Sequence, residues 1–71
     1  MFKASDVQTQ RVHGSRVVAV AVKSASLFVL TENGLTSNST KNGWIDITGE
    51  PADPTAWIAK FSKDGYDTLR R

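Results

Sequence analysis

Cysteine is absent from this 71-residue chain, and histidine occurs only once. Without thiols the chain can form no disulfide and no thiolate metal site. The single histidine, His13, has no group of carboxylates near it in the sequence, so we expect neither a metal site nor a cofactor. The absence of cysteine also agrees with a reducing, cytoplasmic location.

Long apolar runs are also missing. The longest one covers residues 17–22 and has the length of a strand, whereas a membrane-spanning helix needs about 20 apolar residues. The first six residues contain no apolar signal-peptide core. These features predict a soluble, cytoplasmic protein that does not associate with membranes.

Catalytic signatures are not found either. The five glycines are isolated, so no glycine-rich phosphate loop is present. His13 lies at a turn with Ser15 and Asp6 nearby in the sequence, but a nucleophile needs a base that a third group orients, and nothing in the sequence brings these three together. We therefore predict no catalytic residues and a protein that is not an enzyme.

Turn signals recur along the first two thirds of the chain at intervals of nine to eleven residues. They are His13-Gly14-Ser15, Ser24-Ala25-Ser26, Asn33-Gly34 and Asn42-Gly43. Between them lie short runs rich in β-branched and aromatic residues, a pattern typical of an antiparallel meander. The expected strands cover residues 6–12, 16–23, 27–32, 35–39 and 44–48.

The two central strands, 16–23 and 27–32, are apolar on both faces, so both faces should be buried. In the first of them, alternation puts Val18 on the opposite face from Val17. In strand 44–48, Ile45 and Ile47 are expected to point inward. Asn33-Gly34 should form a tight type I′ hairpin turn.

A helix over residues 54–63 is expected after the last strand. Asp53 can cap the free N–H groups at its start, and Pro54 fits the first helical position. Two strands, 56–61 and 66–69, are the competing interpretation. Residues 67–71 are expected to form a frayed basic tail. The predicted fold is α+β and mostly β, in one small domain covering residues 1–71: a sheet of about five strands, flat or curled into a barrel, with one C-terminal helix.

Both faces of the central strands need cover, and one helix covers only one face. The second face must then be buried by closure into a barrel or by a second copy of the chain. Since soluble monomers rarely expose several hundred Å² of contiguous apolar surface, we expect one of these two arrangements and favour a homodimer through a sheet face.

The charge pattern and the aromatic residues indicate binding rather than chemistry. The net charge is +2, with basic ends and an acidic middle. The candidate binding residues are Trp44, Arg16, Lys41 and Asp46. The sequence predicts a small protein that binds another macromolecule, a protein before any other partner. Such a protein would be of the inhibitor or adaptor type that viruses and mobile elements often encode. The alternatives are a single-stranded nucleic-acid-binding barrel, with stacking aromatics beside basic residues, and a small-ligand or glycan-binding module.

Overall fold

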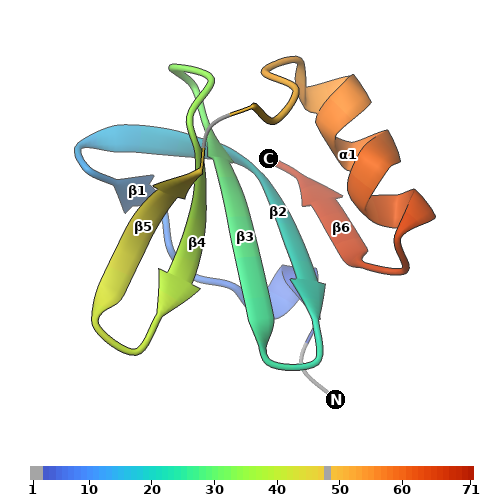
Figure 1. Ribbon diagram of the computed structural model, residues 1–71, viewed down its shortest axis with the longest axis horizontal. Coiled ribbons are helices and arrows are strands. Elements are labelled where there is room, and N and C mark those ends of the chain that lie inside the picture. Colours follow the sequence, from blue (N-terminus) through green and yellow to red (C-terminus); the bar gives the residue numbers. More distant parts are fainter. Residues whose placement is uncertain (1–2, 48) are drawn as a thin grey trace.

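The computed structural model describes residues 3–47 and 49–71. Its elements, in chain order, are η1 (Ala4–Asp6), β1 (Arg11–Val12), β2 (Ser15–Lys23), β3 (Ser26–Thr31), β4 (Thr36–Thr40), β5 (Gly43–Ile47), α1 (Pro54–Lys63) and β6 (Asp67–Arg70). Strands β1 to β5 form an antiparallel meander in sequence order, and β6 pairs with β2. The sheet curls into a nearly closed barrel with one helix near the C-terminus (Figure 1). This confirms the predicted fold class.

Two of the expected elements are wrong. Residues 6–12 were expected to be one strand, but only Arg11–Val12 pair with β2. In the segment before β1, the carbonyls of Val7 and Thr9 accept hydrogen bonds from the side chain of Arg71. These backbone groups are therefore bonded to a side chain instead of to a neighbouring strand. Thr48, at the end of the expected strand 44–48, lies outside the described residues.

The expected basic tail, residues 67–71, is instead mostly a strand. Asp67–Arg70 form β6, antiparallel to β2, and the N–H of Arg71 continues the ladder to the carbonyl of Val18 at 2.8 Å. The physical reason is that β2 has two edges and β3 occupies only one of them. The C-terminal residues bind the other edge, which would otherwise leave buried N–H and C=O groups without partners.

Helix α1 confirms the expected range 54–63. The Asp53 side chain accepts a hydrogen bond from the N–H of Ala56 at 3.2 Å, and Pro54 is the first helical residue. This capping contact is the local signal that separates the helix from the competing strand 56–61, whereas the competing strand 66–69 nearly coincides with β6. No helix of the described residues is long and apolar enough to cross a membrane.

One face of the sheet is covered by the N-terminal segment. Ala4, Val7 and Val12 pack against the valines of β2 and β3, with Leu27 and Trp44 at the margin. Most of these side chains are almost fully buried. The sequence showed no second covering element, because neither side of residues 6–12 is strongly apolar.

The opposite face is covered by α1. Trp57 and Phe61 pack on Ala19, Ala21 and Leu30, and Phe28, Ile58 and Tyr66 lie around this cluster. Both faces of the central strands are therefore buried within one chain. Burial of the core therefore does not require a second copy of the chain. The expected homodimer stays a prediction, and it would have to form through a surface other than these two sheet faces.

A bulge in β2 changes which residues share a face. The register with β3 shifts between Val17 and Ala19. As a result Val17 joins Val20 and Val22 against the N-terminal segment, while Val18 lies with the alanines against α1. Simple alternation places both residues on the wrong faces, because one extra residue reverses the alternation.

Turn geometry also differs from the expectation at one hairpin. After β3 the loop has three residues, closed by a hydrogen bond from Thr31 N–H to Leu35 at 2.9 Å, and only Gly34 has a positive φ. This is the three-residue type of hairpin rather than type I′. The turn between β1 and β2 has positive φ at both His13 and Gly14, as a type I′ turn requires.

Candidate functional site

The predicted binding residues lie in two separate places. Trp44 and Asp46 belong to β5, and Lys41 lies in the turn just before it. Arg16 belongs to β2, next to the hairpin that joins β1 to β2. The structure thus divides the four residues into a β5 surface and a second, basic site.

The β5 surface differs from the expected one at Ile45. This residue was expected to be buried, but its side chain is 53% exposed. The register places Ile45 opposite Asn38, and Asn38 opposite Phe28, on the face that α1 covers. The helix, however, packs on β2 and β6, which lie far from β5 in the strand order of the sheet (Figure 1). Ile45 points to the correct face but lies beyond the reach of the helix.

Trp44 is half-buried and packs against the valine cluster on the opposite face from Ile45. Trp44, a predicted binding residue, therefore does not stand free on the surface. Its ring contributes to the core, since the sheet curls and brings β5 over the valines of β2 and β3. Lys41 is exposed.

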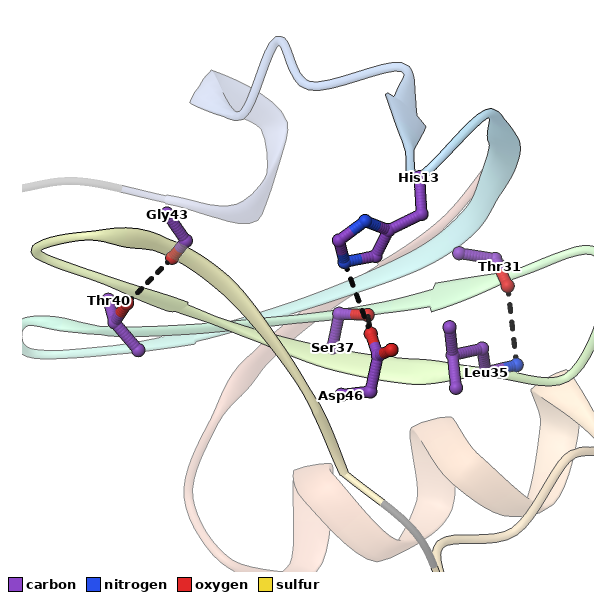
Figure 2. Close-up of polar contacts among 7 residues, drawn as sticks. All are labelled: His13, Thr31, Leu35, Ser37, Thr40, Gly43 and Asp46. Carbon is purple, nitrogen blue, oxygen red and sulfur yellow. Dashed lines mark hydrogen bonds and ion pairs between the residues drawn. The ribbon is translucent and has the colours of Figure 1, made fainter.

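Asp46 forms a small polar cluster with His13 and Ser37 (Figure 2). The Ser37 hydroxyl donates to Asp46 Oδ1 at 3.1 Å, and His13 Nε2 lies 3.3 Å from the same oxygen. Ser37 is fully buried, and both contacts end on the carboxylate rather than linking serine to histidine. A nucleophile needs direct contact with its base, so this arrangement has the residue types of a catalytic triad without its connectivity. It links the β1–β2 turn to β5 through side chains alone, since β5 pairs with no strand but β4 among the described residues.

Asp46→Asn should lower the free energy of unfolding by no more than about 1 kcal/mol. The side chains of His13 and Asp46 are 51% and 49% exposed, so solvent screens their attraction. The asparagine carbonyl can still accept from Ser37. Thermal unfolding followed by circular dichroism measures the change, with Asp64→Asn as the control. A larger loss of unfolding free energy would show that this contact is more than a weak, solvent-screened link between the β1–β2 turn and β5.

A basic pocket of about 540 Å³ lies between the segment before β1 and the start of β2. Three arginines line it, Arg11, Arg16 and Arg71, together with Gln8 and Gln10. Val7 and Val17, both almost fully buried, complete the lining. No acidic side chain is among the lining residues, and the ion pairs of the described residues involve none of the three arginines.

The hairpin register places two of these arginines side by side. Arg11 pairs with Arg16, and the next pair along the strands is joined by a hydrogen bond from Val17 N–H to the carbonyl of Gln10 at 2.9 Å. Hydrogen-bonded and non-hydrogen-bonded residue pairs alternate along an antiparallel ladder, so Arg11 and Arg16 form a non-hydrogen-bonded pair. In such a pair the two side chains lie closer together than in a hydrogen-bonded one. Like charges placed directly opposite destabilise a sheet.

Arg16 was predicted from the sequence as a binding residue, whereas Arg11 and Arg71 were not predicted to lie beside it. The two-residue turn His13-Gly14 was a usable signal for Arg11, because it places Arg11 opposite Arg16. No local signal places Arg71 there, since it arrives through the pairing of β6 with β2.

The aromatic side chains of the described residues pack in the core. Trp57 is fully buried and donates its indole N–H to Thr36 Oγ1 at 3.0 Å. Phe28 lies 5.0 Å from Phe61 and 5.7 Å from Tyr66, measured between ring centroids. None of these rings lines the basic pocket. A stacking platform for bases beside the arginines is therefore not found in the described part of the chain.

Together the fold and these surfaces define a small, mostly β protein with a nearly closed antiparallel sheet, one covering helix and a basic pocket. Residues 3–47 and 49–71 hold no group of three or more histidine and acidic side chains that could bind a metal ion. Comparison with protein-family models, curated proteins and solved structures finds no match.

Proposed function

We propose that this chain is a non-enzymatic binding protein that binds an extended segment of a protein at the free edge of β5. The observation that carries the proposal is the exposure of Ile45 on a strand that pairs on one side only. Within the described residues, β5 is hydrogen-bonded to β4 and to no other strand. Such an edge presents N–H and C=O groups that can pair with another peptide backbone.

The sheet ends on β5 at one side and on β1 and β6, which both pair with β2, at the other, and the two sides differ in their protection. Edge strands are commonly guarded by lysine, proline or outward charges. β6 carries Asp67 and Arg70 and lies beside α1. β5 contains no lysine or proline, and its one charge, Asp46, is engaged with Ser37 and His13. The geometry favours β5 as the edge that accepts a strand.

A second copy of the chain is one partner that this edge can bind. In an antiparallel β5–β5 pairing centred on Ile45, each Asp46 would face the Trp44 of the other copy, so no like charges would be opposed. The pairing would cover Ile45 and bind both free edges. This form of the homodimer replaces the expected one through a sheet face, which the N-terminal segment and α1 already cover.

Ile45→Lys should abolish this association and leave stability within about 0.5 kcal/mol of the wild type, because surface substitutions rarely do more. Light scattering at micromolar to submillimolar concentration should show a mass above one chain for the wild type and one chain for the variant. Leu69→Lys is the matched control, because Leu69 is 37% exposed on the other edge strand. A wild-type mass of one chain would contradict the dimer. Equal retention of a partner protein by wild type and Ile45→Lys would contradict the β5 edge.

Binding of single-stranded nucleic acid is the second candidate, supported by the arginine pocket. Phosphate contacts are strongest at low salt, so retention on single-stranded DNA or RNA at about 50 mM salt is its test. No retention under that condition would reject it.

A further inference from the structure

We propose that the pocket formed by Arg11, Arg16 and Arg71 binds the doubly charged phosphate group of a small phosphate ester. This site is separate from the β5 edge and does not depend on the function proposed for it. Three features of the pocket support this ligand: the arginines that line it, the contacts that their guanidinium groups already make, and its volume.

Arg71 builds one wall of the pocket. Its backbone N–H continues the pairing with β2, and its guanidinium donates to the carbonyls of Val7 and Thr9. These contacts hold the segment before β1 in place. A guanidinium has five N–H donors, so Arg71 keeps others for a ligand.

Arg11 and Arg16 supply most of the free donors. Arg11 donates from one Nη to the carbonyl of Gly14 at 3.1 Å. In the described part of the chain Arg16 makes no side-chain hydrogen bond or ion pair, although the Glu32 N–H donates to its carbonyl at 2.7 Å. The ion pairs of the described residues lie elsewhere, between His13 and Asp46 and between Lys60 and Glu50.

The charge in the pocket matches a dianion. Arg11 and Arg16 are opposed in the register and like charges there repel, and one phosphate group accepts hydrogen bonds from both side chains through several oxygens. A single carboxylate would compensate only one of them. The volume of about 540 Å³ falls in the range of small-molecule sites, about 300–1,000 Å³, so the pocket holds a phosphate together with part of the group that carries it. Gln8 and Gln10 offer amide donors and acceptors to that group.

A small ester fits better than a nucleic-acid strand. A strand needs basic residues along a track and aromatic rings on which bases stack. The rings of the described residues lie in the core clusters or at their margins, and the exposed Lys41 lies at the turn between β4 and β5. The positive charge that is gathered in one concavity belongs to the three arginines.

The test is a titration of the ¹⁵N-labelled chain with a nucleoside 5′-monophosphate and, separately, with inorganic phosphate, each at constant ionic strength set with chloride. The expected result is saturable shifts of the amides of residues 8–11, 16 and 17, larger or at lower concentration for the ester. If inorganic phosphate saturated the same shifts at the same concentration as the ester, the carrier group would make no contact. That result would overturn the ester as the ligand. Shifts that do not saturate would overturn the site.

Arg16→Gln is the discriminating variant, because Arg16 has no side-chain hydrogen bond or ion pair to lose within the described residues. It should weaken binding of the monophosphate roughly tenfold, as expected for the loss of a charge-assisted hydrogen bond. In phosphate-free buffer it should leave the melting temperature unchanged or raise it, since the repulsion with Arg11 is removed. Lys41→Gln removes the same charge from an exposed turn and should leave binding unchanged. Equal binding by Arg16→Gln and wild type would overturn the proposal, and so would tighter binding of a single-stranded oligonucleotide than of the monophosphate.

Discussion

Trp57→Ala is expected to destabilise the fold by about 3–5 kcal/mol. Trp57 is fully buried between α1 and the sheet, its ring centroid lies 4.5 Å from that of Phe61, and its N–H donates to Thr36. Truncation leaves a cavity in the helix-side cluster and removes the partner of a buried hydroxyl. Since small domains are stable by only about 5–15 kcal/mol, a large part of the stability would be lost. Urea unfolding followed by circular dichroism measures the effect.

Trp57→Phe is the matched control for this prediction. It retains an aromatic ring but loses the N–H that binds Thr36, and we expect a smaller loss of about 1–3 kcal/mol. The ordering of the two variants separates packing from hydrogen bonding. If Trp57→Ala stayed within about 1 kcal/mol of the wild type, α1 would not be the cover of this face, because a fully buried tryptophan in a packed core cannot be removed so cheaply.

Val12→Asp is expected to destabilise the chain by about 3–5 kcal/mol, the range for an uncompensated buried charge. Val12 is 2% exposed and packs with Ala4 and Val7 over the valines of β2 and β3. The variant places a carboxylate in this cluster. We therefore expect a lower urea midpoint and loss of amide protection in β2 and β3.

Ser5→Asp introduces the same charge into the same N-terminal segment, at an exposed position. It should change the free energy of unfolding by less than about 0.5 kcal/mol. Equal effects of the two substitutions would show that the N-terminal segment does not cover the sheet. In that case the valine face would need a second copy of the chain, and the unfolding midpoint of the wild type would depend on protein concentration.

Much of the fold could be predicted because its signals are local. The turn residues set the meander, the valines of β2 identify a strand buried on both faces, and Asp53 with Pro54 marks the helix start. The wrong expectations share a cause. The bulge at Val17, the strand at residues 67–70 and the cover from the N-terminal segment all depend on pairing between residues far apart in the sequence.

The candidate sites follow the same division. Arg16 could be selected from the sequence as a basic residue beside a turn, and its neighbour Arg11 follows from the hairpin register. The third arginine, Arg71, reaches the pocket only because β6 binds the open edge of β2. The exposure of Ile45 depends on how far α1 extends across the sheet, which no pattern within β5 reveals.

The amino-acid sequence by itself determined strands β2 to β5 and helix α1, because backbone preferences, turn residues and capping act within a few residues. Only the tertiary structure decided which faces are covered, which edge stays open and which charges meet. Those outcomes depend on contacts between distant segments, and each is selected by the burial of apolar area and the pairing of backbone groups over the whole chain.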